Sequence, residues 1–239
     1  MCNKKNNLCS VLEAFQGVTG IKDEKKKLSS LYSQYKAIAK DVILGGCFEI
    51  NGVRRIYPLE IEFYYHEEGE DGLKDPVMYH TADHDGKMLD YYPLGSLNCH
   101  ISGMDVTFEN QEKQYRASFL IRKYRVCEYE SGEWVEKKEF EKLSTYIYED
   151  MFMNIPLSDG ITVKWISGET VNPTKEIVRK QRINVAEYKR DNDGKFTKVE
   201  ITKEEYDKLS DVEQQEYFSY SGKKLKKCKR EWNYSVVNQ

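Results

Sequence analysis

The sequence lacks both a long hydrophobic run and an excess of either charge. Its 239 residues include 37 Lys and Arg against 40 Asp and Glu, so the formal net charge is -3 at pH 7. This balance excludes a uniformly basic nucleic-acid binder, and any anion-binding surface must be local. No apolar stretch approaches the roughly 18 residues that span a bilayer, and the beginning lacks the apolar core of a signal peptide. We expect a cytoplasmic protein with no membrane partner.

Paired cysteines and common catalytic motifs are also missing. The six cysteines stand apart with no CxxC pair, so we expect reduced thiols, with neither a disulfide framework nor a zinc ribbon. No GxSxG, GxxxxGK or GxGxxG occurs, so triad-hydrolase and phosphate-loop chemistries have no support, and we expect no cofactor and no metal. A metal site remains an alternative that would draw on His66, His80, His84, Cys99 and His100.

What the sequence does contain is a β-prone aromatic run with carboxylates in it, PLEIEFYYH at residues 58–66. Three apolar and three polar residues alternate there: Ile61, Phe63 and Tyr65 with Glu60, Glu62 and Tyr64. The period of two places both glutamates on one face of a strand. Such a face is either the wet side of an edge strand or, because carboxylates are costly to bury, a chemical site.

Hydrophobic periodicity predicts the elements around this run. Residues 28–39 have the spacing of one helical face. Asn51-Gly52 is a hairpin turn signal between a strand through residues 48–50 and the strand 53–65. The segment 67–95, rich in Asp, Gly, His and Pro, reads as a functional loop. Further strands are predicted at 97–101, 106–109 and 115–126.

The second half of the chain is more charged and less regular. We predict a helix over 133–148 and a short helix from Asn172-Pro173-Thr174 through Arg179. A hairpin is expected at 183–199, around Asp191-Asn192-Asp193-Gly194. Thr202 and Glu205 have the spacing of a capping box at the start of another helix.

Segments between residues 37 and 127 resemble the alkyladenine (3-methyladenine) DNA glycosylase family in order and residue type. AIAKDVILGGCF resembles its helix-to-strand entry, LEIEFY its Glu-Ala-Tyr active-site strand, GSLNCHISGM its Gly-Thr-Leu-Tyr-Val-Tyr stretch, and ASFLIR its Ala-Cys-Val-Leu-Leu-Arg. The resemblance implies an α+β fold: a single globular domain over 1–239 with a central curved antiparallel β-sheet surrounded by helices and long loops. It implies a core at 28–127 and a C-terminal elaboration at 128–239 packed on that core.

The resemblance also implies roles for individual residues. Glu62 falls on the water-activating glutamate, with Glu60 on the same face as the fallback. Tyr64 falls on the tyrosine that stacks against the flipped base, and Arg122 on the active-site arginine. His80 follows the acidic loop, as the family's pocket histidine does. The structural alternative is that Arg122 simply pairs with Glu62 or another acid.

Several positions depart from the family. Asn98 stands where an aromatic wedges into the duplex, and His100 where a second tyrosine stacks on the base. Ser102 replaces the aromatic before Gly-Met, and Asp105 is an added carboxylate. We expect a more polar pocket, suited to a bulky or polar modified base of foreign (phage) DNA and hence to antiviral defence. The alternatives are housekeeping alkylpurine repair and a non-catalytic nucleic-acid-binding module.

DNA is the expected partner of a monomeric enzyme, and local basic runs are the candidates for backbone contact. The alternative is a solvated charged face. A DNA-binding role predicts that these runs lie on the pocket side. The denser run comprises Lys223, Lys224, Lys226, Lys227, Lys229 and Arg230, and the second comprises Arg179, Lys180 and Arg182.

Overall fold

The computed structural model of this chain describes residues 7–78, 80–137, 142–155, 160–170 and 176–237. The chain divides into two compact units. The first contains Met1–Arg179 and Tyr234–Gln239, and the second contains Lys180–Asn233. The predicted division into a core and a packed elaboration stays a prediction.

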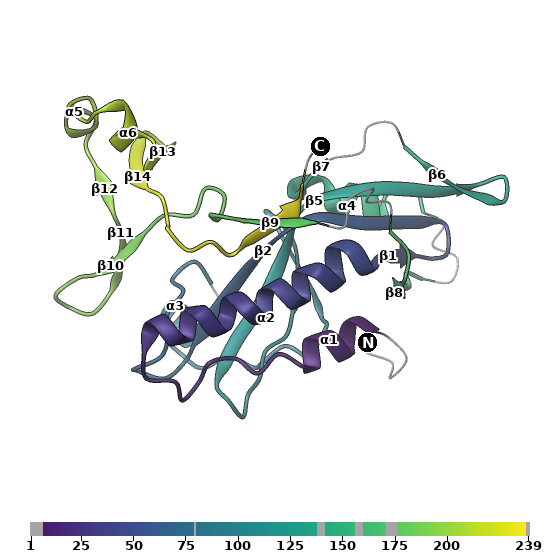
Figure 1. Cartoon of the computed structure of the whole chain (residues 1–239), viewed down its shortest axis with the longest axis horizontal. Helices are drawn as coiled ribbons and strands as arrows, with labels where there is room; N and C mark the ends of the chain where they lie inside the picture. The colour runs from purple at the N-terminus through teal and green to yellow at the C-terminus, as the bar shows by residue number, and fades with distance from the viewer. Residues whose placement is uncertain (1–6, 79, 138–141, 156–159, 171–175, 238–239) are drawn as a thin grey trace. The chain divides into compact units, whose positions relative to one another are not determined.

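A curved antiparallel sheet is the centre of the first unit (Figure 1). Its strands follow the order β3-β4-β5-β2-β1-β8, and each pair of neighbours on this path is antiparallel. The expectation of an α+β chain with a curved antiparallel sheet is thereby confirmed. The bounds on this path are β1 (Gly46–Ile50), β2 (Arg54–Glu67), β3 (Leu97–His100), β4 (Gly103–Thr107), β5 (Tyr115–Glu130) and β8 (Val163–Ser167). Four more strands belong to the sheet: β6 (Glu133–Glu136), β7 (Lys142–Leu143), β9 (Ile177–Lys180) and β15 (Asn233–Val236).

A long helix covers one face of this sheet. Helix α2 (Glu24–Gly45) begins at Asp23, whose carboxylate caps it by accepting a 2.8 Å hydrogen bond from the Lys26 amide. Its apolar face is buried, and the ring of Tyr35 stacks on Phe63 of β2 at 4.1 Å. The residues of β2 alternate, so Phe63 and its same-face neighbours form the core with α2. Glu62 and Tyr64 therefore lie on the other face.

The local elements before residue 130 largely follow the sequence prediction. The predicted helix and the two strands joined at Asn51-Gly52 are confirmed, and both turn residues have positive φ, at 49° and 70°. Strand β4 begins and ends earlier than predicted. Within the predicted loop, α3 (Ala82–Asp85) is a short helix.

The helix predicted at 133–148 is wrong. Ser131 and Gly132 have φ of 52° and 94°, a two-residue turn that folds β6 back onto β5. The backbone groups on the edge of β5 provide a pairing partner that outweighs the helical propensity of this charged segment. The rest contains β7, a 3-10 turn at Ser144–Tyr146 and α4 (Ile147–Phe152); residues 138–141 lie outside the described residues.

The short helix predicted to reach Arg179 is also wrong. Ile177–Lys180 is strand β9, because β15 returns from the C-terminal end of the chain to pair with it. The predicted starting residues of that helix, 172–174, lie outside the described part.

The second unit contains a hairpin and a small sheet. Strands β10 (Tyr188–Arg190) and β11 (Phe196–Lys198) form the hairpin expected around residues 191–194. The predicted capping box at Thr202 is confirmed, and Ser210 with Glu213 forms a second one. The remaining elements are β12 (Glu200–Ile201), α5 (Lys203–Tyr206), α6 (Asp211–Gln214), β13 (Tyr217–Tyr220) and β14 (Lys223–Lys226).

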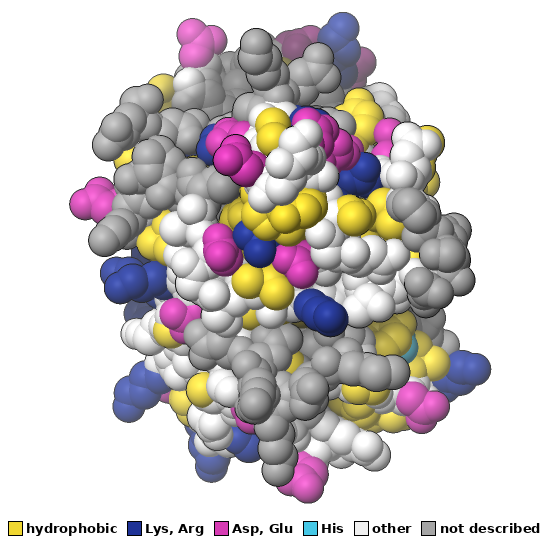
Figure 2. All heavy atoms as spheres, turned by 90° about the vertical axis from the view of Figure 1, so that its right-hand side faces the viewer, with side chains coloured by type: hydrophobic (Ala, Val, Ile, Leu, Met, Phe, Trp, Pro, Cys, Tyr) yellow, Lys and Arg dark blue, Asp and Glu magenta, His cyan; other side chains and the backbone are white. Residues whose placement is uncertain are grey.

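The end of the first unit that carries the β1–β2 and β5–β6 turns exposes hydrophobic side chains among charged ones (Figure 2). Val53, Tyr129 and Val135 are 38%, 49% and 37% exposed there. Single exposed apolar residues are ordinary on soluble proteins. None of the described helices is both long and apolar enough to cross a membrane.

The cysteines differ from expectation at one position. Cys9 takes part in a disulfide, so the prediction of reduced thiols is wrong there. A disulfide requires closeness in space, which sequence spacing does not reveal. Cys47, Cys99, Cys127 and Cys228 are free thiols.

Candidate active site

Strand register gathers the predicted site residues on the sheet face opposite α2. Leu120 of β5 lies directly opposite both Glu62 of β2 and Asp105 of β4. Directly opposite residues project from the same face of a sheet, so the three form a row across it. Asn98 of β3 continues this row, because it lies opposite Asp105.

Glu62, Tyr64 and Arg122 form one hydrogen-bonded cluster. The Glu62 side chain is fully buried, and its Oε1 accepts a 2.6 Å hydrogen bond from the Tyr64 hydroxyl. Arg122 Nη2 donates to the same oxygen at 2.5 Å and lies 3.2 Å from the Tyr64 oxygen. Two residues 60 positions apart in sequence, both predicted to be catalytic, are therefore in direct contact.

A bulge positions Arg122. Register shifts between Pro58 and Ile61 leave Glu60 opposite Lys123 and Ile61 opposite Ile121, with Arg122 between the paired positions. Bulges bend a strand and redirect its side chains, and they are frequent beside active sites.

The cluster favours the charged form of its arginine. Burial lowers the pKa of Arg122, but its interactions with Tyr64 and Glu62 outweigh this effect, and the net pKa lies above the ordinary value. Glu60 acts in the same direction. The Arg122 side chain is 18% exposed, whereas Glu62 has no exposure. Solvent therefore reaches part of the Arg122 side chain but not Glu62.

His100 and Asp105 form a second polar pair on this face. His100 Nε2 lies 3.3 Å from Asp105 Oδ2, and their side chains are 18% and 13% exposed. Tyr148 holds the turn after His100, because its hydroxyl lies 2.7 Å from the carbonyl oxygens of both His100 and Gly103. Ser102 is exposed in that turn and donates its amide to His100 Nδ1 at 3.3 Å.

The predicted functional loop packs on the same sheet face. Met78 forms a buried cluster with Tyr64 and Leu120, and Val77 packs against them. The loop therefore supplies apolar contacts directly beside the Glu62 cluster.

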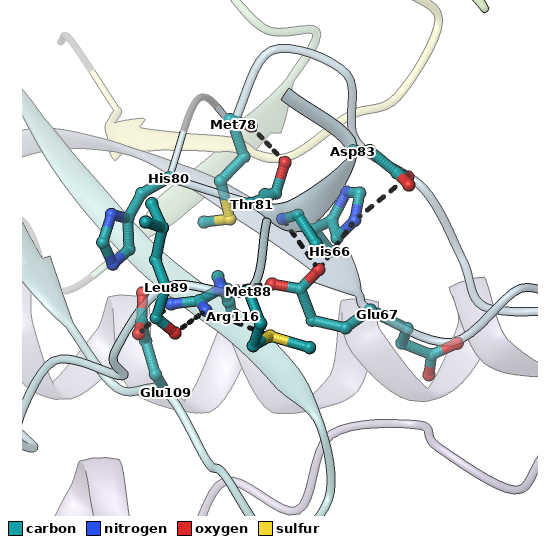
Figure 3. A network of polar contacts seen from close by, with 12 residues as sticks. His66, Glu67, Met78, His80, Thr81, Asp83, Met88, Leu89, Glu109 and Arg116 are labelled. Carbon is teal, nitrogen blue, oxygen red and sulfur yellow. Dashed lines mark hydrogen bonds and ion pairs between the residues drawn. The ribbon is translucent and has the colours of Figure 1, made fainter. Parts of the chain in front are cut away.

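Arg116 ties the loop to the sheet (Figure 3). Its fully buried guanidinium donates to Glu68 and, at 3.1 Å, to Glu109 Oε2. It also donates to the carbonyl oxygen of Leu89 at 2.6 Å and lies over the ring of Tyr91 at 4.1 Å. Sequence analysis missed this Arg116 cluster, although an arginine at the start of a core strand beside an acidic loop is a signal for it.

Two groups in and beside the Arg116 cluster have shifted pKa values. Burial raises the pKa of Glu109 to about 7, against hydrogen bonds from the Tyr92 amide and Arg116. Burial lowers the pKa of His66, whose Nδ1 accepts a 3.3 Å hydrogen bond from the Asp75 amide. Both shifts favour neutral forms in a poorly hydrated region.

His80 lies in the loop and not in the sheet. Its Nε2 is 2.9 Å from the Asp90 carbonyl oxygen, and its ring stacks on Tyr92 at 4.3 Å. Figure 3 shows it beside Arg116 and Glu109. A role for His80 in the base pocket stays a prediction.

The residues of the denser basic run, which are candidates for DNA contact, all have partners within the second unit. Lys223, Lys226 and Lys229 form ion pairs with Glu200, Glu187 and Glu216 at 2.9, 3.3 and 3.5 Å. Lys224 and Arg230 lie over the rings of Tyr206 and Trp232, and Lys227 donates to the Gln215 carbonyl oxygen. Exposed ion pairs are weak, so these cations remain able to exchange their partners for phosphates.

The second basic run is less uniform. Arg182 is buried, with its guanidinium over Trp232 and 3.4 Å from Cys228 Sγ. Arg179 lies over the ring of Tyr32 in the first unit. Burial makes Arg182 a structural residue, so only part of this run suits phosphate contact.

The sheet face carries carboxyl, phenol, imidazole and guanidinium groups. In the part of the chain that the structure describes, no three His, Cys, Asp or Glu side chains gather in a way that would hold a metal ion. Comparison of the chain with protein-family models, with curated proteins and with solved structures finds no match.

Proposed function

We propose that this chain is a monofunctional DNA glycosylase, which flips a modified base out of DNA and hydrolyses its N-glycosidic bond to leave an abasic site. The observation that carries the proposal is the meeting of Glu62, Tyr64 and Arg122 on one sheet face, with Asp105 in the same row. These residues come from three strands. Glu62, Tyr64 and Arg122 stand where the sequence resembles the family's motifs, and Asp105 is an added carboxylate that departs from them.

The reaction needs a carboxylate beside the sugar. As the base leaves, the sugar acquires oxocarbenium character, and a water molecule must be oriented and deprotonated to attack it. Glu62 is assigned this role. Its carboxylate is held by the Tyr64 hydroxyl and by Arg122, so it is oriented before substrate arrives. Arg122, partly exposed, is placed to hold a flanking phosphate or the water with its planar fork of donors.

Base extrusion costs a few kcal/mol and is offset by contacts in the pocket. The Tyr64 ring, packed with Met78 and Leu120, supplies the apolar contacts for a base. His100 and Asp105 make the adjacent surface polar. A polar surface favours a bulky or polar modified base, such as those of phage DNA, over a simple methylpurine, and so favours a role in antiviral defence.

Base release from duplex DNA tests the proposal. The panel contains alkylated, deaminated, hydroxymethylated and glucosylated bases, and abasic sites are detected by alkaline cleavage. Wild type should release at least one of these bases, Glu62→Gln should reduce release at least a hundredfold, and Glu130→Gln at an exposed carboxylate should not. Glu60→Gln decides between the two candidate carboxylates. Absence of release from the whole panel would reject the proposal.

A non-catalytic nucleic-acid-binding module is the second candidate, and the full burial of Glu62 favours it. A carboxylate that pairs with Arg122 and has no exposure can serve structure alone. This candidate predicts DNA binding that Glu62→Gln leaves intact, with no base release. In both cases the exposed cations of the second unit should give binding that weakens with salt.

A further inference from the structure

One buried carboxylate oxygen of Asp105 receives no hydrogen bond from any residue that the structure describes. The residue is 9% exposed, and its Oδ2 faces His100 Nε2 at 3.3 Å. Its Oδ1 is buried and has no hydrogen-bond partner among the described residues. A buried acceptor without a donor costs free energy, so native structures rarely keep one without a reason.

The position of Asp105 indicates which molecule would supply the hydrogen-bond donor for Oδ1. Asp105 and Glu62 flank Leu120 in one row, and neighbouring strands lie about 4.8 Å apart, so roughly 10 Å separates the two backbone positions. Between them lies Leu120, which packs in one apolar cluster with Tyr64 and Met78. A flat ring placed there would have one edge toward Asp105 and its sugar toward Glu62.

We propose that Asp105 Oδ1 accepts a hydrogen bond from the extruded base, so that the substrate is a base with an exocyclic amino group on the edge facing β4. This inference rests on the proposed function, because it treats the base as a substrate. Recognition of the base by Asp105 does not itself require catalysis. A carboxylate accepts and never donates when ionised, so it selects an amino group and disfavours a carbonyl oxygen at the same place.

This inference is tested with pairs of DNA bases in which one base has an exocyclic amino group where the other has a carbonyl oxygen. Duplexes carry 5-hydroxymethylcytosine or 5-hydroxymethyluracil, and adenine or hypoxanthine, at one position. Wild type should release the amino base of each pair at least tenfold faster than the carbonyl base. The carbonyl base offers no amino donor, so it leaves the Asp105 carboxylate oxygen unpaired. Asp105→Asn, which has the same shape but can donate, should reverse the preference, and Asp105→Ala should abolish it.

Asp71→Asn, at an exposed loop position, is the matched control and should keep the wild-type ratio. Thermal unfolding of each variant identifies a general loss of structure. Equal ratios in wild type and Asp105→Asn, or a wild-type preference for the carbonyl bases, would overturn the inference.

A binding measurement separates this inference from the proposed function. Fluorescence anisotropy gives the affinity of the same proteins for the same bases placed in mismatched duplexes. Should no base be released, amino-selective binding that Asp105→Asn reverses would keep the recognition role and reject the glycosylase. Binding that ignores the amino group, or no binding at all, would reject the recognition role.

Discussion

Arg122 donates a 2.5 Å hydrogen bond to Glu62, and the two residues differ sharply in exposure, at 18% and 0% of their side chains. The buried Glu62 carboxylate depends on the partly exposed Arg122 for compensation of its charge. A carboxylate with no access to solvent must be compensated by a cation or by hydrogen bonds, and Arg122 and the Tyr64 hydroxyl provide both. The pair is therefore a structural requirement of the sheet face as well as a candidate catalytic group.

Replacing Arg122 should destabilise the protein more than replacing Glu62. Arg122→Met leaves the Glu62 carboxylate buried without its cation, a change that costs about 3–5 kcal/mol. Glu62→Gln removes the charge and leaves an arginine that solvent can reach, so its cost should be lower. The double variant should cost less than the sum of the two. Urea unfolding measures all three, and a cost below about 1 kcal/mol for Arg122→Met would contradict this account.

Arg116→Met should release the loop of residues 68–95. The substitution leaves Glu68 and Glu109 buried without their cation, so we expect a loss of about 3–5 kcal/mol and faster proteolysis within the loop. Arg125→Met is the control, because its ion pair with Glu136 is partly exposed and should contribute no more than about 1 kcal/mol. Equal proteolysis of the two variants would argue against the Arg116 cluster as the attachment.

Glu109 should make the protein less stable as pH rises. Its pKa is raised from 4.5 to about 7, so the folded state binds more protons than the unfolded state between these values. The stability contributed by the protonated group is present below about pH 4.5 and is lost as pH rises through about 7. The lowered pKa of His66 acts in the opposite direction. The stability that neutral His66 contributes to the folded state is present above pH 6.5 and is lost as pH falls below that value.

Glu109→Gln isolates the first effect, because both proteins retain His66. The variant should gain stability relative to wild type as pH rises from about 4.5 to 7. Melting temperatures measured from pH 4.5 to 8 provide the comparison. Parallel profiles for the two proteins would show that Glu109 titrates normally.

Two adjacent glycines should respond in opposite directions to alanine. A Cβ at Gly46 would overlap the Ile166 carbonyl oxygen and the Trp165 ring, so Gly46→Ala should disturb the pairing of β1 with β8 and cost about 1–3 kcal/mol. Gly45 ends α2 with open space at its Cβ, so Gly45→Ala should stabilise by about 0.5–1 kcal/mol. Thermal unfolding of both variants checks the contrast, which equal effects would refute.

Local patterns predicted much of the first half of the chain. The apolar spacing of residues 28–39, the Asn51-Gly52 turn and the alternation around Glu62 each correspond to an element in the structure. These features depend on neighbouring residues and on backbone conformations that particular side chains favour. The helix prediction for residues 133–148 was wrong because Glu133–Glu136 finds its hydrogen bonds at the edge of β5.

The sequence by itself determined that Glu62 and Tyr64 share a strand face opposite the apolar core, because alternation alone sets that. It also indicated Arg122 through resemblance to the family, and Asp105 as a departure from it. Only the tertiary structure decided that the bulge brings Arg122 to Glu62, that Asp105 shares their face, and that Arg116 holds the loop. Register and long-range ion pairs arise from contacts between segments far apart in the chain, and no local spacing encodes those contacts.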